Sequence, residues 1–299
     1  MTDYGHSLTF GAFITPVASP PQRPVELAVA AEHASLELVG FQDHPYQPKL
    51  QDTWTLMSYV AARTQNLRVV GDVLSLPLRP PATPARAAAS LDRLSGGRVE
   101  IGLGAGAFLD GVVAMGEPRL GRGESVDALE EAITVLRGLW NTHEQGGFRF
   151  EGRFYRVTGA HRGPAPAHPV PIHVGAYGPR MLRLTGRVAD GWLPSLSYLP
   201  EGLDSLAGMS QQIDDAAAAA GRNPAAITRL LNVGGRFTTN GGAAFDGPPA
   251  HWAEQIAEIA LTTGISGFLL MADDPAQIEI FGQEVAPRAR ELLDAARSR

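Results

Sequence analysis

The turn at residues 175–181 carries the pattern in this chain that most directly indicates ligand chemistry. A short apolar run at 171–174 precedes it, and a helical pattern over 180–188 follows. Glycines in such a turn let the backbone approach a ligand closely, and the first amides of a helix point outward with the positive end of the helix dipole behind them. Pro179 suits the first helical position, where the amide that proline lacks would be unpaired anyway. The pattern predicts a phosphate site on Gly175, Ala176, Tyr177, Gly178, Pro179, Arg180 and Met181.

A simpler interpretation of this turn stays open, because most glycine turns between a strand and a helix bind no ligand. Arg180 and Arg183 would add positive charge to the turn, which favours an anion. The choice depends on which other residues the fold brings to the same place.

Two further positions carry side chains suited to proton transfer. His44 lies between Asp43 and Pro45 directly after a predicted strand, and histidine titrates near neutral pH. A loop histidine that only ends the strand is the alternative. Asp72 follows Gly71 in the middle of another predicted strand, which indicates a β-bulge or a strand that ends early. A buried Asp72 would need a hydrogen-bond donor.

The histidines do not form a recognisable metal motif. The sequence contains neither an HxH pair nor an HExxH motif, so we expect no metal site. Asp43 and His44 together with His173 are the alternative ligand set. No GxSxG nucleophile motif occurs either.

Eight apolar strand patterns alternate with eight helical patterns along the chain. Strands are expected at 8–13, 37–42, 67–76, 99–103, 171–174, 191–194, 227–238 and 265–271. Helices are expected at 25–36, 53–63, 82–94, 125–140, 180–188, 203–220, 250–262 and 275–297. This alternation predicts an α/β fold, a single (β/α)8 TIM barrel that forms one domain over residues 1–299.

Two details refine this expectation. Alternating apolar residues at 148–157 predict a small hairpin inserted between the fourth helix and the fifth strand. A doubly wound open sheet is the rival fold. The glycines at 102, 104 and 106 support it only weakly, because the last of them does not stand at the position of the third glycine in a dinucleotide-binding fingerprint.

The composition excludes several functional classes. The net charge of -6 and the lack of a basic cluster argue against a nucleic-acid partner. No cysteine occurs, so disulfides and thiolate chemistry are excluded, and we expect a cytoplasmic protein. The first ten residues show no signal-peptide pattern, and no run of about 18 apolar residues predicts a membrane span.

A TIM barrel carries its active site at the carboxyl ends of its strands. The loops after the second to fifth strands would therefore bring together His44, the bulge at Asp72, the glycine loop 104–108 and the turn 175–181. Three aromatic side chains would either form the wall of a flat ligand site or belong to the core: Tyr46, Trp54 and Trp192.

Taken together, these residues resemble the luciferase-like monooxygenase family. The resemblance covers nearly the whole chain, and its most specific segments are 43–45 (DHP), 94–106 (LSGGRVEIGLGAG), 175–182 (GAYGPRML) and 189–192 (ADGW). Members of this family are (β/α)8 barrels that use reduced FMN or the deazaflavin F420. The resemblance therefore implies an oxidoreductase or monooxygenase that acts on a small organic substrate, as a homodimer.

The resemblance also implies roles for individual residues. The cofactor phosphate would lie on the amides of 177–181, and His44 would face the reactive centre of the ring. The bulge in the third strand would lie behind the ring, with a non-proline cis peptide around Asp72 and Val73. The cofactor-binding set also includes Gly104, Ala105 and Gly106.

Two departures from the family pattern limit what is carried over. Many F420-dependent members that oxidise alcohols have a proton-donating glutamate just after the strand-four glycines, where this chain has Ala107 and Phe108. The chain is also shorter than the bacterial luciferases, which argues against light emission and aldehyde oxidation. The segments 43–45 and 178–182 favour F420 over FMN.

The sequence therefore predicts an F420- or FMN-dependent oxidoreductase that transfers a hydride or activates oxygen. A metal- or phosphate-using barrel hydrolase or lyase is one alternative. A flavin-binding barrel without activity is another.

Overall fold

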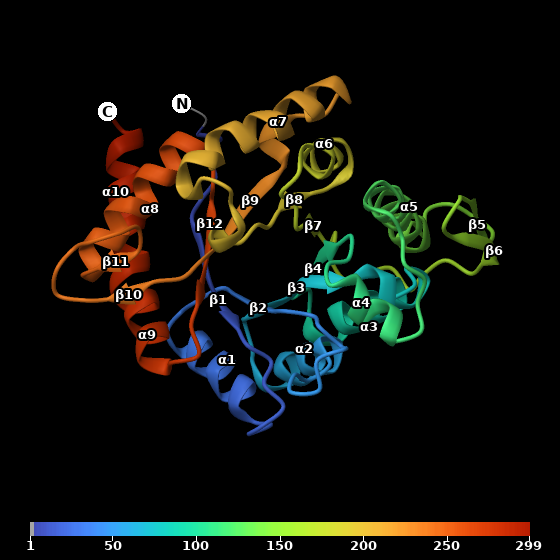
Figure 1. Cartoon of the computed structure of the whole chain (residues 1–299), viewed down its shortest axis with the longest axis horizontal. Coiled ribbons are helices and arrows are strands. Elements are labelled where there is room, and N and C mark those ends of the chain that lie inside the picture. The colour runs from blue at the N-terminus through green and yellow to red at the C-terminus, as the bar shows by residue number, and fades with distance from the viewer. Residues whose placement is uncertain (1–2) are drawn as a thin grey trace.

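Eight parallel strands close into a barrel in the computed structural model, which describes residues 3–299 (Figure 1). Around the barrel the strands follow the order β1-β12-β9-β8-β7-β4-β3-β2. Their bounds are β1 (Thr9–Ile14), β2 (Leu38–Phe41), β3 (Arg68–Ser75), β4 (Val99–Gly104), β7 (Ile172–Val174), β8 (Gly191–Trp192), β9 (Thr228–Val233) and β12 (Gly267–Met271).

Helices surround the barrel and connect successive strands (Figure 1). They are α1 (Arg23–His33), α2 (Thr53–Arg63), α3 (Ala82–Ser95), α4 (Leu109–Ala114), α5 (Arg122–Trp140), α6 (Pro179–Val188), α7 (Ser205–Ala219), α8 (Pro249–Thr263), α9 (Pro275–Ile280) and α10 (Ala286–Arg297). Arg297 near the end of the chain donates hydrogen bonds to Asp3, so the two ends lie together. No helix in residues 3–299 has the length and apolar character to cross a membrane.

Two separate apolar layers hold the barrel together. The larger layer lies between strands and helices and contains the fully buried side chains of Phe10, Trp192 and Trp252. The smaller layer fills the barrel lumen, and Val73 packs against it. Its buried members are Leu38, Val70, Leu193, Leu230 and Leu269. Strands that are covered on both faces in this way are apolar almost throughout, which is why the sequence shows short continuous apolar runs.

The predicted TIM barrel is confirmed, and the doubly wound alternative is wrong because β1 pairs with both β2 and β12 and so closes the sheet. The predicted hairpin is also present, as β5 (Phe148–Glu151) and β6 (Arg156–Ala160) between α5 and β7. The eight predicted helices are found with small shifts at their ends.

Several elements were not predicted in this form. α4 lies in the loop after β4, where Gly111 lowers helix propensity. A Cβ at Gly111 would lie 2.6 Å from the ring of Tyr46, so tertiary packing selects this glycine. A π-helical turn (Phe281–Val285) joins α9 to α10, with Gly282 packed against the end of α1. The loop between β9 and α8 contains a short pair of parallel strands, β10 (Arg236–Phe237) and β11 (Asp246–Gly247).

The packing of α6 on α7 gives a testable prediction from two helical glycines. A Cβ on Gly186 would lie 2.3 Å from the carbonyl oxygen of Ile213, whereas a Cβ on Gly208 would meet nothing within 4 Å. We expect Gly186→Ala to lower the free energy of unfolding by about 1–3 kcal/mol through overpacking. Gly208→Ala should raise it by about 0.5–1 kcal/mol, because alanine loses less entropy in a helix. Urea unfolding of both variants checks this, and a neutral Gly186→Ala would contradict the close contact.

Candidate active site at the barrel mouth

Four neighbouring strands position the predicted site residues. β7, β4, β3 and β2 are adjacent in the barrel, and their carboxyl ends open on the same mouth. The turn 175–178 follows β7, the loop 105–108 follows β4, and His44 follows β2. The fold therefore brings the predicted residues to one continuous arc of the mouth.

The turn before α6 presents free backbone amides at the rim. Residues 177–180 are exposed, and a Cβ added to Gly178 would meet no atom within 4 Å. The first amide of α6 with a carbonyl partner is that of Leu182, which donates to Gly178 at 3.0 Å. In residues 3–299 the amides of Tyr177, Gly178, Arg180 and Met181 have no hydrogen-bond acceptor. These donors, together with the positive end of the helix dipole, are suited to an anion.

Trp192 of β8 and the backbone at Ser195, just after that strand, hold this turn in place from behind. The indole nitrogen of Trp192 donates to the carbonyl oxygen of Ala176 at 2.9 Å. The amide of Ser195 donates to the hydroxyl of Tyr177, also at 2.9 Å. The backbone of the turn is thus fixed independently of any ligand.

The charge expected from Arg180 is partly compensated. Its guanidinium pairs with Asp127 on α5 at 2.5 Å and lies against Gly123 at the start of that helix. Arg183 is exposed on α6. The amide of Arg180 remains available, so the turn depends mainly on its backbone.

His44 is held by a buried ionic contact of its neighbour Asp43. Asp43 is 2% exposed and accepts hydrogen bonds from the amide of Ser75 at 2.9 Å and from Arg79 at 2.7 and 2.8 Å. This contact ties the loop after β2 to the end of β3. From the sequence, Asp43 was expected only as a neighbour of His44 or as an alternative metal ligand. Ser75 and Arg79 lie too far along the chain for their contact with Asp43 to be predicted.

The imidazole of His44 lies among aromatic side chains. Its Nδ1 is 2.7 Å from the hydroxyl of Tyr46, and Phe108 approaches edge-on with ring centroids 5.4 Å apart. Burial lowers the pKa of His44 below its ordinary value, and the charge of Asp43 acts in the opposite direction. A neutral imidazole near pH 7 is able to accept a proton or to donate one from its second nitrogen.

The predicted bulge in β3 is present. The register with β4 shifts between Gly71 and Leu74, and the Asp72–Val73 peptide bond is cis, as the resemblance implies. Successive residues of a strand normally face opposite sides, but here Asp72 and Val73 both face the lumen. The side chain of Asp72 lies beside Gly40 of β2, and Val73 packs against the lumen cluster.

A glycine at the end of β4 and another just after β7 make room for Val73. A Cβ on Gly104 would lie 2.7 Å from the Val73 side chain, and a Cβ on Gly175 would lie 3.2 Å from it. Gly106 has a positive φ of 97° and packs against Pro77, while Ala105 is half-buried against the core. These residues shape the floor of the mouth, and Val73 is the side chain that covers Gly104 and Gly175.

Two aromatic residues do not belong to the mouth. Trp192 is fully buried in the layer between strands and helices and supports the turn from behind. Trp54 lies on α2, beside a hollow between α2 and α3. Tyr46 alone of the three lies beside His44. The interpretation of Trp54 and Trp192 as walls of a ligand site is therefore wrong.

The alternative metal ligands are engaged elsewhere. Asp43 is paired with Arg79, and His173 bonds through Nε2 to Glu100 at 2.7 Å in the lower lumen. Within residues 3–299 no three side chains of histidine, aspartate or glutamate are grouped to hold a metal ion.

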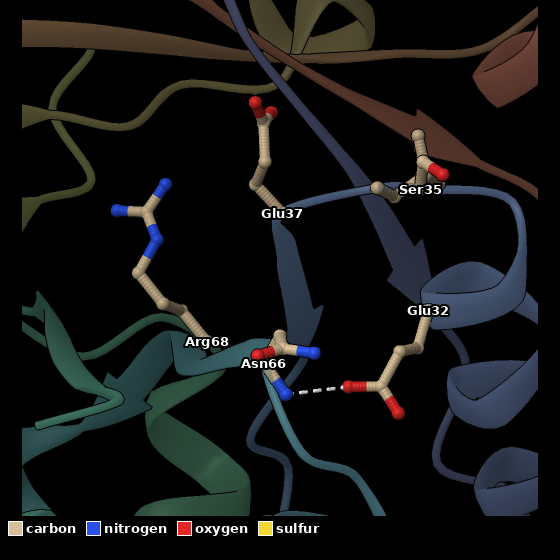
Figure 2. Close-up of a pocket in the computed structure, with 6 residues that line it drawn as sticks. Glu32, Ser35, Glu37, Asn66 and Arg68 are labelled. Carbon is tan, nitrogen blue, oxygen red and sulfur yellow. Dashed lines mark hydrogen bonds between the residues drawn. The ribbon is translucent and has the colours of Figure 1, made fainter. Parts of the chain in front are cut away.

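A pocket of about 430 Å³ lies at the opposite, amino-terminal end of the barrel (Figure 2). One oxygen of Glu32 accepts bonds from the amides of three consecutive residues, 65–67, at 2.7–3.0 Å. Glu37 bonds to Arg290, and Arg68 pairs with Glu100. The charged groups around this pocket have partners within the protein, which indicates a structural role at the end of the barrel that normally serves stability.

Comparison with known proteins shows where the chain belongs. Residues 2–235 match the family model described as luciferase-like monooxygenase. An uncharacterized protein of Mycobacterium tuberculosis is 39% identical over 142 residues, which cover 48% of this chain and 47% of that protein. The F420-dependent glucose-6-phosphate dehydrogenase of Nakamurella multipartita is 35% identical over 187 residues, which cover 60% of this chain and 54% of that enzyme. The chain thus spans about half the length of these curated relatives.

A solved structure extends the likeness to the whole fold. An F420-dependent secondary alcohol dehydrogenase in complex with an F420-acetone adduct superposes with a TM-score of 0.82 and 19% identity. The superposition covers 95% of this chain and 99% of that structure. At this identity the likeness shows a shared fold.

The contact of Asp43 gives a second prediction, with Asp52 as its matched control. Both carboxylates bond to Arg79, but the side chain of Asp43 is fully buried and that of Asp52 is 44% exposed. We expect Asp43→Asn to lower the free energy of unfolding by about 3 kcal/mol, because it breaks a buried ion pair from one side. Asp52→Asn should cost less than about 1 kcal/mol, since asparagine also caps α2. Equal losses in denaturant unfolding would refute the special role of Asp43.

Proposed function

Because the chain belongs to the luciferase-like monooxygenase family, we propose that it is an oxidoreductase that binds F420 or FMN at the barrel mouth and acts on a small organic substrate. Residues 1–299 would act as one domain. The single observation that carries the proposal is the set of free amides at 177–181, on the same arc of the mouth as His44 and the β3 bulge.

The residues present fit a phosphate-bearing cofactor of this kind. The exposed turn offers unpaired donors and open space at Gly178, where a phosphate group would be held. Val73, supported by the glycines at 104 and 175, offers an apolar surface for a flat ring. His44, whose pKa is lowered by burial, would handle a proton at the same mouth.

A bound F420 or FMN supplies the hydride-transfer or oxygen chemistry, and the protein contributes binding, orientation and proton handling. F420 is favoured, since the relative from Nakamurella multipartita is named as an F420-dependent enzyme. The segments 43–45 and 178–182 agree with this choice.

We further propose a cytoplasmic homodimer. Exposed apolar side chains on two neighbouring helices support the dimer, because Leu94 on α3 is 86% exposed and Tyr59 on α2 is 46% exposed. A hollow of about 470 Å³ beside Leu94 is lined largely by apolar side chains of the same two helices. The cysteine-free composition agrees with a reducing compartment.

The dimer proposal predicts that Leu94→Glu yields a monomer. A charge at this apolar position would have to be desolvated in the interface, whereas the exposed side chain has no role in the monomer fold. Sedimentation velocity of the wild type and the variant measures this, with Val113→Glu on α4, 43% exposed, as the control. A wild-type monomer, or a dimer that survives Leu94→Glu, would count against it.

Cofactor titration tests the proposed function and the amide turn together. Wild type, Gly178→Ala and Gly178→Glu are titrated with F420, FMN and phosphate-free riboflavin, with ring fluorescence as the readout. Gly178 has an ordinary φ of -95° and open space, so both substitutions are compatible with the fold. We expect wild type and Gly178→Ala to bind F420 or FMN, and Gly178→Glu to bind at least about tenfold more weakly because its carboxylate repels the phosphate.

Riboflavin provides the internal control of this experiment. FMN should bind more tightly than riboflavin to the wild type, and this preference should vanish in Gly178→Glu. Binding of neither F420 nor FMN would overturn the proposed function. Unchanged affinity in Gly178→Glu would place the phosphate elsewhere.

A further inference from the structure

The side chain of Tyr46 lies against His44 in the loop that follows β2. Its hydroxyl oxygen is 2.7 Å from Nδ1 of His44, and the centroids of the two rings are 5.6 Å apart. Within residues 3–299 this is the only hydrogen bond that either side chain makes. The contact therefore decides which nitrogen of the neutral imidazole carries the proton.

Packing holds the ring of Tyr46 in place. Gly111 on α4 lies directly against this ring, since a Cβ on Gly111 would be 2.6 Å from its Cγ. The ring of Phe108 meets the imidazole of His44 edge-on, with centroids 5.4 Å apart, and its centroid is 6.2 Å from that of Tyr46. Phe108 has no polar side-chain atom, so it supports both rings without competing for their hydrogen bond.

The usual partners of an Nδ1–H group are missing beside His44. A histidine with a proton on Nδ1 commonly donates it to a carboxylate or to a backbone carbonyl oxygen. The carboxylate of the adjacent Asp43 accepts instead from Arg79 and from the amide of Ser75. In the described part of the chain no carboxylate or carbonyl oxygen accepts a hydrogen bond from the imidazole. Its partner is a hydroxyl, which can donate as well as accept.

The chemistry of the two groups decides the direction of this bond. The O–H of a phenol is more acidic than the N–H of a neutral imidazole, and a bare imidazole nitrogen accepts a hydrogen bond more strongly than a phenol oxygen. Burial and the charge of Asp43 raise the pKa of Tyr46 above its ordinary value, so the phenol keeps its proton near pH 7. Tyr46 therefore donates to Nδ1, and the proton of the neutral imidazole lies on Nε2.

Nε2 is the atom of His44 that is left for a ligand. It has no hydrogen-bond partner among the described residues, and it is not one of their buried unpaired atoms, so solvent reaches it. His44 follows β2, which pairs with β3 up to the bulge at Gly71. With its proton on Nε2, the neutral imidazole is a hydrogen-bond donor at the mouth.

We propose that Tyr46 is a positioning residue that holds neutral His44 with its proton on Nε2, and that His44 donates a hydrogen bond from this atom to a carbonyl oxygen of the substrate. The tautomer follows from the contacts of this chain, whereas the role toward a substrate rests on the proposed function. A donor at this place stabilises the negative charge that develops on a carbonyl oxygen during reduction. It is not suited to an alcohol, whose hydroxyl proton has to be removed.

The substrate class that fits this donor is a small ketone or aldehyde. Ala107 and Phe108 stand where alcohol-oxidising members of the family carry a glutamate, so the loop after β4 adds no side chain that could take the proton of an alcohol. In the reduction, the carbonyl carbon gains the hydride that a reduced F420 or FMN supplies. The electron pair of the C=O bond moves to the oxygen, which takes a proton from water, and the cofactor is left oxidised.

The tautomer is tested on the cofactor-free protein by NMR of 15N-labelled histidine at about pH 8, above the ordinary histidine pKa of about 6.5. Wild type, Tyr46→Phe and Tyr198→Phe are compared, and His44→Gln identifies the signals of His44. Tyr46→Phe keeps the ring that packs against Gly111 and removes only the hydroxyl. Tyr198 is 66% exposed and packs against Tyr177, so its variant is the matched control.

We expect His44 of the wild type and of Tyr198→Phe to show a bare Nδ1 and a protonated Nε2. In Tyr46→Phe the form with a proton on Nδ1 should become populated, so that the shifts of the two nitrogens move toward each other. A protonated Nδ1 in the wild type, or equal tautomer populations in the wild type and Tyr46→Phe, would overturn the role of Tyr46.

The role toward a substrate is tested separately, without oxygen and with reduced F420 or FMN bound. The wild type should consume members of a panel of aliphatic, cyclic and aromatic ketones and aldehydes. Tyr46→Phe should lower kcat at least about threefold and keep the cofactor affinity, since the lost hydrogen bond orients only His44.

The possible failures are distinguishable. No consumption of any carbonyl compound by the cofactor-bound wild type, or an unchanged kcat in Tyr46→Phe, would overturn the role toward a substrate while the tautomer stands. Failure of the wild type to bind either cofactor would overturn the proposed function and this role together, and the tautomer would still be decided by the cofactor-free NMR measurement.

Discussion

The first amides of a helix have no hydrogen-bond partner inside the helix. The properties of the barrel mouth depend on the position of these amides at the start of α6. They are exposed at the rim, and their turn is fixed from behind by Trp192 and by the Ser195–Tyr177 bond. Because these supports belong to the protein, the donors are already oriented before an anion arrives, which lowers the entropic cost of binding. A rigid turn with free amides is thus the feature of the mouth that is best suited to an anion.

The bulge in β3 links this turn to the rest of the mouth. It directs Val73 over Gly104 and Gly175, and it leaves the side chain of Asp72 beside Gly40 of β2. Asp43 then ties the end of β3 to the loop that carries His44. Four loops that are distant in sequence are in this way held at fixed positions around one apolar floor.

The sequence predicted what local patterns determine. Short apolar runs and helical periodicity predicted the eight strand–helix pairs, and Gly71 with Asp72 predicted the bulge. Contacts between distant residues were not predictable. Three such contacts depend on the completed fold. They are the pairing of Arg180 with Asp127, the burial of Trp192 between the strands and the helices, and the packing of Gly111 on α4 against Tyr46.

Amide-resolved NMR tests whether the amides at 177–181 bind the phosphate of F420 or FMN, as we propose. In 15N-labelled protein, addition of F420 or FMN should shift the amide signals of Tyr177, Gly178, Arg180 and Met181 most strongly and slow their exchange with water. Riboflavin, which lacks the phosphate, should leave those four signals nearly unchanged. If F420 or FMN binds and the largest shifts fall elsewhere while these four signals stay in place, the phosphate is not bound by this turn.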